Sequence, residues 1–511
     1  SARHNNRSQQ RHHNEFHFHM TLILFCLLYG SKISIISRPE ESFRTLFRNF
    51  AHLMKRFQVR QYITHYRSLT SLGLPIIIGQ TGTILLSCAD TLMIGHHGTD
   101  ELAAAAFVNN MFNLVLLFGL GFSYGLTPIV GNLFGREQSP RIGETVKNAL
   151  AANSLLALLL GAVVTMLYAN IGNLGQPTEL LPLMRPYLLV LFVSLPCVCW
   201  FNVFKQFSDG ITDTRTPMWI LLGGNILNII GNYLLIYGKL GLPELGLFGA
   251  GISTMLSRVI MTIVFAAIFF LSKRYRIYRV GFIQGKVNRT AFLEQNKLGW
   301  PLALQMGMES AAFSLSSIMV GWVGATALAA HQIMMTISQF FFLVYYGMGA
   351  AVAVRISYFN GQHDYTAARR SANAGFHLVL LIAMAVSLPV GLSRNIIGYL
   401  FSDSAEVCHL VAMTIIVLIV YQFGDGLQCV FSNALRGLSD VKPLMYIAFF
   451  AYFIVSLPLG YLFGITLNMG LVGVWLAFPF GLTTAGILYY TAFKRRLAKE
   501  ISIHQSFNST M

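Results

Sequence analysis

Residues 75–98 read PIIIGQTGTILLSCADTLMIGHHG, and residues 301–324 read PLALQMGMESAAFSLSSIMVGWVG. Each stretch begins with proline and ends with glycine, and the two lie 226 positions apart (301 minus 75). The same separation recurs between Leu102-Ala103-Ala104 and Leu328-Ala329-Ala330, between Gly135 and Gly361, and between Pro217 and Pro443. A single inserted residue would break this register, so the sequence indicates that one ancestral half was duplicated and that each half is a structural unit.

Both halves are strongly apolar. The chain of 511 residues is 55% hydrophobic and 11% charged, with a mean hydropathy of +0.59, whereas soluble domains are about 25% charged. Twelve apolar segments of membrane-spanning length follow one another: 70–94, 103–128, 146–169, 184–206, 216–237, 247–272, 298–322, 329–354, 371–396, 407–431, 442–464 and 470–493. We therefore expect an all-α integral membrane protein with 12 transmembrane helices in two six-helix bundles, which an even number of spans makes parallel repeats.

The formal charge of +16 would suit a nucleic-acid partner, but its distribution along the chain argues against one. Basic residues fall in alternate connections: Arg136, Arg141, Lys147, Lys205, Arg215, the run from Lys273 to Arg289, Arg355, Arg369, Arg370, Arg436, Lys442 and the run from Lys494 to Lys499. The opposite side carries only Arg185, Lys239 and Arg394. This pattern predicts a multi-pass protein of the plasma (inner) membrane with both termini cytoplasmic.

Five parts of the chain can be separated. They are a dispensable or disordered extension (1–53), an N-terminal bundle (54–272), a cytoplasmic linker (273–297), a C-terminal bundle (298–497) and a tail (498–511). Met54 is the expected start, although the apolar run from Thr21 to Tyr29 could also serve as the core of a signal peptide. The linker contains Lys273-Arg274-Tyr275-Arg276, whose charges should face the inner leaflet without forming a specific lipid or nucleic-acid site.

Three acids lie inside predicted spans, where an ionisable group is costly and marks a functional hypothesis. They are Asp90, Glu309 and Asp425. In the first span Thr83, Ser87 and Asp90 follow one helix face, and the fifth span presents Asn225, Asn228 and Asn232 with a similar period. Facing each other, these groups would suit a proton or a small hard cation. The alternative is interhelical hydrogen bonding without a ligand.

The second half offers a different polar set. Gln305 and Glu309 are four residues apart in the seventh span, and Tyr421 and Asp425 are four apart in the tenth. A tyrosine beside a carboxylate supplies an oxygen and a π face to a cation. A buried carboxylate has lost its hydration, so binding a proton or Na+ there is favourable. A satisfied polar cluster is the alternative.

Other polar residues suggest structural roles. We expect His331 to be a hydrogen-bonded packing residue and Arg258 to pair with a carbonyl or carboxylate. Asp209, Asp213, Asp403 and Asp440 are expected in connections, as solvated or capping groups, and the six cysteines as small packing residues. The chain has no phosphate-binding GxxxxGK[ST] loop, no HExxH and no DDxxD, which argues against an enzyme.

The motifs together resemble a known family. Pro75 with Gln80, the run from Asp90 to Gly95, Gly131-Asn132 before Gly135, and Leu328 to Gln332 with Leu435-Arg436-Gly437 look like the multidrug and toxic compound extrusion (MATE) family, NorM-like branch. The resemblance covers about residues 65–497. It implies two six-helix bundles around a central cleft that opens alternately to either side, and export of cationic or amphipathic drugs in exchange for Na+ or H+.

The resemblance also implies roles for individual residues. Glu309, Tyr421 and Asp425 match the cation-binding cluster of NorM-like members, where Na+ would be the only metal, and Asp90 would assist. Asn228, Asn232 and Thr254 match an auxiliary polar site, although some relatives have an acid in place of Asn232. Asn110, Gln332 and Gln305 correspond to the drug cleft.

The resemblance implies no cofactor beyond the coupling ion, and we expect a monomer. A flippase for lipid-linked saccharides or lipids of the same superfamily is the alternative within transport. An intramembrane enzyme and a purely structural membrane protein are the rivals from other classes.

Overall fold

The structure is a computed structural model, and it describes residues 59–173 and 177–509. These residues form helices and connections, without a strand. The predictions about the extension 1–53, Met54 as the start, and Cys26 lie outside the described residues. The five described cysteines are all free; Cys199, Cys408 and Cys429 are buried, as expected of packing residues, whereas Cys88 is exposed.

The helices of the first half follow the predicted spans. They are α4 (Val59–His97), α5 (Thr99–Ser123), α6 (Leu126–Gly135), α7 (Ser139–Asn170), α8 (Leu181–Gly210), α9 (Arg215–Ile236) and α10 (Gly246–Leu271). Helices α5 and α6 form one span with a short break at Tyr124-Gly125. The short helix α11 (Arg276–Gln284) then lies in the connection between the halves.

The second half repeats this order. Its helices are α12 (Arg289–Val323), α13 (Ala325–Gly361), α14 (Tyr365–Leu392), α15 (Arg394–Ile397), α16 (Ala405–Gly437), α17 (Lys442–Phe449), α18 (Leu457–Tyr461) and α19 (Gly470–Ser509). Helices α17 and α18 belong to one span, in which residues 450–456 and 462–466 are π-helix. Such wide turns are rare and often occur at functional sites.

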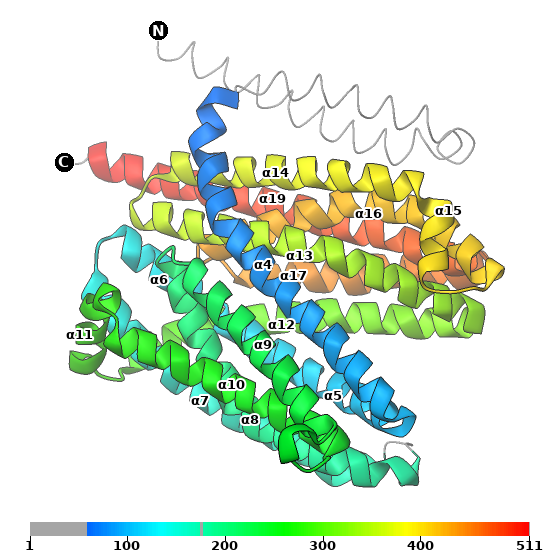
Figure 1. Cartoon of the computed structure of the whole chain (residues 1–511). Helices are drawn as coiled ribbons and strands as arrows, with labels where there is room; N and C mark the ends of the chain where they lie inside the picture. The colour runs from blue at the N-terminus through cyan, green and yellow to red at the C-terminus, as the bar shows by residue number, and fades with distance from the viewer. Residues whose placement is uncertain (1–58, 174–176, 510–511) are drawn as a thin grey trace. The chain divides into compact units, whose positions relative to one another are not determined.

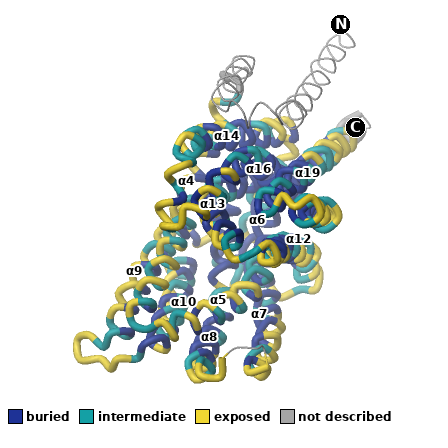
Figure 2. The backbone as a smooth tube through the Cα atoms, turned by 90° about the vertical axis from the view of Figure 1, so that its right-hand side faces the viewer, coloured by how far each residue is buried: buried dark blue, intermediate teal, exposed yellow. Residues whose placement is uncertain are grey.

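The prediction of an all-helical, duplicated membrane protein is confirmed. Eleven helical segments of the described chain are long and apolar enough to cross a membrane. The remaining predicted span is α12, which at 35 residues is also long enough. It is less apolar because it carries Gln305, Glu309 and several serines. In the view turned by 90°, the helices form two groups, one with α5, α7, α8, α9 and α10 and the other with α12, α13, α14, α16 and α19 (Figure 2).

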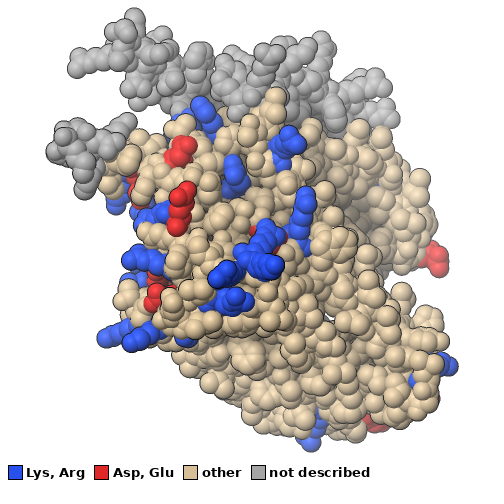
Figure 3. Space-filling view, turned by 60° about the vertical axis from the view of Figure 1, so that its left-hand side comes forward, with Lys and Arg blue, Asp and Glu red and all other residues tan. Residues whose placement is uncertain are grey.

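Both groups of helices extend between the same two ends of the membrane-spanning part, which we call the near end and the far end. The near end holds α6, α11 and the C-terminal end of α19, and the far end holds α15 (Figure 1). Lys and Arg gather on the near-end side when it is turned forward (Figure 3). The distribution agrees with the charge asymmetry that the sequence predicts.

The two bundles meet at the near end through residues that are equivalent in the duplication. A Cβ atom on Gly131 would lie 2.0 Å from the Ser357 hydroxyl oxygen, and one on Gly361 would lie 2.2 Å from the Asn132 carbonyl oxygen. A Cβ on Gly135 would lie 2.1 Å from the Tyr358 carbonyl oxygen. Residues 131, 132 and 135 correspond to 357, 358 and 361 at the separation of 226. An approximate twofold axis therefore passes between α6 and the end of α13, and only glycine permits this approach.

The first helix of each half also packs on the opposite bundle near this end. On α4, Gly73 lies against Met348 of α13, and His65 hydrogen-bonds Ser371 of α14 at 2.9 Å. On α12, Gln295 donates to the Phe122 carbonyl of α5 at 3.2 Å. The near-end part of each of these two helices thus contacts the opposite bundle.

Of the two acids expected in the first-half connections, Asp209 is misplaced, and Asp213 keeps its place as a capping group. Asp209 lies inside α8, is 4% exposed and forms an ion pair with Lys205 at 2.9 Å. Asp213 is buried rather than solvated, because it accepts from the Tyr275 hydroxyl (2.5 Å) and pairs with Arg274 (2.9 Å). Its hydrogen bond with Thr216 at the start of α9 is the capping contact that was expected. The linker is thereby held against the first bundle.

Candidate functional site

The acids of the second half face an aromatic-walled region between α12 and α16. Tyr421 and Asp425 lie on α16 and are 3% and 1% exposed. Glu309 comes from α12, half-buried, and lies within electrostatic range of both. The Tyr421 ring packs against Trp475 and Phe478 of α19, with centroids 6.0 and 6.2 Å apart. The structure therefore brings together the three residues of the predicted cation cluster.

The carboxylates of Glu309 and Asp425 differ in their hydrogen-bond partners. Glu309 Oε1 accepts from Gln428 Nε2 at 3.0 Å. The Asp425 Oδ2 atom is buried and has no hydrogen-bond partner among the described residues. Two carboxylates within electrostatic range repel each other, and an unpaired buried charge is expensive. A proton or a small cation between them would remove both costs.

Sequence reasoning missed two residues that hold Glu309 in place. Gln428 Nε2 donates to Glu309 and lies 3.0 Å from the Tyr452 hydroxyl oxygen. Tyr452 lies in the π-helical segment 450–456, whose wider turn places this side chain towards α16. Gln428 could have been found, because Tyr421, Asp425 and Gln428 continue one face at i, i+4 and i+7. No sequence signal marks Tyr452.

A small cavity adjoins this cluster. It has a volume of about 60 Å³, which is enough for water or an ion. Gln305 and Glu309 line it on one side, and Arg436 and Tyr124 line it towards the near end. The Arg436 guanidinium lies 5.2 Å from the Tyr124 ring centroid. Gln305 is therefore placed beside the acids, and a fixed cation closes the other end of the cavity.

The polar residues of the first half also converge. Asp90 Oδ1 on α4 accepts from Asn232 Nδ2 on α9 at 2.6 Å, and the same nitrogen lies 3.1 Å from Asn228 Oδ1. Asn228 Nδ2 lies 3.1 Å from Thr254 Oγ1 on α10. With the Asn228 amide turned over, its nitrogen donates to Asp90 and its oxygen accepts from the Thr254 hydroxyl and backbone N–H. The predicted auxiliary set is thus assembled, with Asn232 Oδ1 buried and without a partner in the described chain.

The two polar sites are not equivalent in the duplication. The counterpart of Asp90 on α12 is Ser316, seven residues beyond Glu309. Seven helical residues rise about 10 Å. The acid of the second half therefore sits about 10 Å nearer the near end than the acid of the first half.

Other predicted residues take the following places. Asn110 on α5 and Gln332 on α13 are exposed, so neither belongs to either polar cluster. His331 is buried, where its Nδ1 accepts from the Trp475 indole N–H at 3.0 Å and its Nε2 lies 2.8 Å from the Ser317 hydroxyl oxygen. Because the indole can only donate, the proton of His331 must be on Nε2. The prediction of a satisfied packing histidine agrees with these contacts.

Arg258 does not pair as expected. Its guanidinium donates to the Ser194 hydroxyl at 2.8 Å and lies 5.5 Å from the Phe112 ring centroid. Neither a carbonyl nor a carboxylate is its hydrogen-bond partner among the described residues. Its charge is within electrostatic range of Asp90, so the first-half site already contains a fixed cation nearby.

Two helical bundles that arose by duplication, each with polar groups buried inside it, define a multi-pass membrane protein built around internal sites. A family model described as MatE matches residues 75–234 and 301–462, one copy in each half. These segments make up more than half of the chain, so it belongs to the MatE family of membrane transporters.

Similar proteins and solved structures agree with membership of this family. The chain is 30% identical over 447 residues to "Probable multidrug resistance protein NorM" of Mannheimia succiniciproducens, covering 85% of this chain and 96% of that protein. It is 29% identical over 440 residues to the protein of the same name from Photorhabdus laumondii, covering 85% and 97%. An outward-facing multidrug resistance MATE family transporter has a TM-score of 0.77 at 19% identity, covering 86% of this chain and 97% of that one. A eukaryotic MATE transporter has a TM-score of 0.76 at 17% identity, covering 86% and 98%.

Proposed function

We propose that the chain is a secondary-active antiporter that exports cationic or amphipathic organic compounds in exchange for Na+ or H+. The observation that carries the proposal is Asp425, whose buried Oδ2 lacks a partner beside Glu309 and Tyr421. A permanent structural ion pair would satisfy this oxygen. A site that must load and release a cation leaves it free in one state.

The bundle contacts support alternating access. At the near end, α6 and α13 touch through Gly131, Gly135 and Gly361. The near end is thus closed in this structure. If the termini are cytoplasmic, as the positive-inside rule predicts, the closed side is the cytoplasmic one.

Coupling follows from linkage. If a cation stabilises one access state and the organic substrate stabilises the other, each ligand lowers the affinity for the other. Glu309 lines both the cation cluster and the cavity that leads towards Arg436. Neutralising Glu309 and Asp425 with a cation would weaken attraction for a cationic substrate, which supports exchange rather than co-transport. The drug substrates of this chain are proposed from the names of its relatives.

The test is efflux of a fluorescent cationic dye from vesicles that contain the protein, under an imposed Na+ gradient and then an H+ gradient. We expect one gradient to accelerate efflux in the wild type. Asp425→Asn should abolish that acceleration while the protein unfolds at the same or a higher temperature, because an unpaired buried charge has been removed. Asp403→Asn, which changes an exposed acid in a connection, is the matched control and should behave as wild type.

The outcomes distinguish the possible coupling ions and test the role of the second-half cluster. Acceleration by Na+ alone assigns a sodium site, and acceleration by H+ alone assigns a proton site. Unchanged gradient-driven efflux in Asp425→Asn would refute the role of the second-half cluster. If neither gradient moves dye in the wild type, antiport of organic cations is wrong, and transfer of a lipid-linked saccharide between leaflets becomes the next assay.

A further inference from the structure

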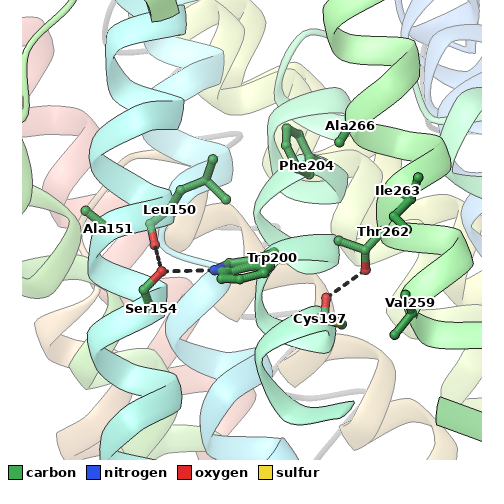
Figure 4. Close-up of a pocket in the computed structure, with 10 residues that line it drawn as sticks. All are labelled: Leu150, Ala151, Ser154, Cys197, Trp200, Phe204, Val259, Thr262, Ile263 and Ala266. Atoms are coloured by element: carbon green, nitrogen blue, oxygen red, sulfur yellow. Dashed lines mark hydrogen bonds between the residues drawn. The ribbon is translucent and has the colours of Figure 1, made fainter. Parts of the chain in front are cut away.

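An apolar groove runs down the outside of the first bundle between α7, α8 and α10, with a volume of about 600 Å³ (Figure 4). The side-chain hydrogen bonds that join its lining residues are internal, and in one of them Ser154 Oγ donates to the Leu150 carbonyl at 2.8 Å. Trp200 Nε1 donates to Ser154 Oγ at 2.9 Å, and Thr262 Oγ1 donates to the Cys197 carbonyl at 2.9 Å. The wall therefore presents apolar surface to an occupant, with the Trp200 ring across it.

The groove is about as long as one leaflet is deep. Ala266 is five residues before the near end of α10, and Phe204 is six residues before that of α8. Ser154 is 15 residues from the near end of α7. At 1.5 Å per residue the groove extends from about 8 to about 22 Å from the helix ends. Since a hydrocarbon core is about 30 Å thick, this is the depth of one layer of acyl chains.

Helix α11 lies at the mouth of the groove. Its Phe282 ring packs 5.6 Å from the Phe269 ring of α10, one turn beyond Ala266. A Cβ on Gly281 would lie 1.9 Å from the Pro140 carbonyl oxygen, so α11 is docked closely on the start of α7. On its outer side α11 exposes an apolar stripe made of Ile277, Val280 and Ile283.

Basic side chains flank this stripe. Lys273, Arg276 and Lys286 are exposed and make no ion pair with any described acid. Their neighbours are already engaged, because Arg274 pairs with Asp213 and Lys147 donates to the Gly285 carbonyl. An amphipathic helix with an outward apolar stripe and unpaired basic residues lies at a membrane interface and attracts anionic lipid.

The duplicated half lacks this arrangement. The counterpart of Leu150 is Phe376, at the separation of 226, and the counterpart of Ala266 is Tyr490, when α10 and α19 are aligned at Gly246 and Gly470. In the second bundle Phe376 and Tyr490 both pack on Phe431, with ring centroids 5.8 and 4.8 Å apart. Aromatic rings of the chain itself thus occupy the corresponding region there. The groove is a feature of one bundle and not of the shared scaffold.

We propose that the groove and α11 form a binding site for one anionic phospholipid. One acyl chain lies in the groove against Trp200, and the headgroup phosphate lies beside Lys273, Arg276 and Lys286. This revises the sequence-based expectation that the linker carries no specific lipid site. The site is separate from both polar clusters and does not depend on the proposed antiport.

The test measures quenching of Trp200 fluorescence in the full-length protein by phospholipids with brominated acyl chains. The Trp200 signal is the difference between wild type and Trp200→Phe. We expect phosphatidylglycerol to reach half-maximal quenching at a lower mole fraction than phosphatidylcholine, by roughly fivefold for each basic residue that contacts the headgroup. Raising the salt concentration should reduce the preference.

Substitutions separate the contribution of the lipid headgroup from that of the acyl chain. Combined Lys273→Gln, Arg276→Gln and Lys286→Gln should abolish the preference for phosphatidylglycerol but keep quenching by both lipids. Ala266→Phe should reduce quenching by both. Arg370→Gln, at the near end of the other bundle, should change neither. Equal quenching by the two lipids in the wild type, or a preference that survives the triple substitution, would overturn the proposal and leave only bulk lipid against the helix surface.

Discussion

Gly361→Ala is the sharpest perturbation of the contact between the bundles. The added Cβ would lie 2.2 Å from the Asn132 carbonyl oxygen, where an ordinary contact needs about 3.4 Å, so α6 and α13 must separate by about 1 Å. Overpacking of this kind costs about 1–3 kcal/mol. If the near end opens in the other access state, the cost applies only to the closed state. A cost of 2 kcal/mol would change the ratio of the two states about 30-fold.

The assay is the distance between fluorophores on Leu240→Cys and Leu400→Cys, two exposed far-end positions in different bundles, in a background without the native cysteines. Gly361→Ala should increase the fraction of molecules whose far ends are close together. Gly321→Ala is the control, because it is also a helical glycine but its Cβ would meet nothing within 4 Å. Identical distance distributions for the two variants would show that the glycine contact does not set the access equilibrium.

Three further predictions follow. Gln428→Leu releases Glu309 from a charge-assisted hydrogen bond worth about 1.5–3 kcal/mol, so the cation concentration for half-maximal efflux should fall by roughly 10- to 150-fold. An unchanged concentration would show that this hydrogen bond does not affect cation binding. His331→Ala leaves the Trp475 N–H unpaired in the core and should lower the unfolding free energy by about 2–5 kcal/mol, whereas wild-type thermal stability would show that the bond is dispensable. Burial and hydrogen-bond donation to Asp213 raise the pKa of Tyr275, so its contribution to stability is full below about pH 10 and is lost as pH rises through the folded-state pKa. Tyr275→Phe should remove this alkaline loss, and an unaltered pH profile would count against it.

Much of the candidate site could be predicted. The spacing of Tyr421 and Asp425 on one helix face, and the cost of an acid such as Glu309 in a membrane, are visible in the letters of the sequence. Contacts between helices cannot be predicted from the sequence in this way, because they depend on how far each helix is rotated and shifted against its neighbour. Tyr452 meets Gln428 beside Glu309 only because a π-helical segment alters the rotation of the span that carries Tyr452. The misjudged Asp209 has the same cause, since α8 continues past the expected end of its span.

The sequence by itself determined the membrane class, the number of spans and the duplication, because hydropathy and a constant separation of 226 residues are properties of order along the chain. Only the tertiary structure decided that Gly361 packs against Asn132 beside an approximate twofold axis. It also decided that the first bundle has an open groove, whereas aromatic rings occupy the corresponding region of the second bundle. The physical reason is that close packing is set by the shapes of surfaces from distant segments. Neither surface is specified until both helices are in place.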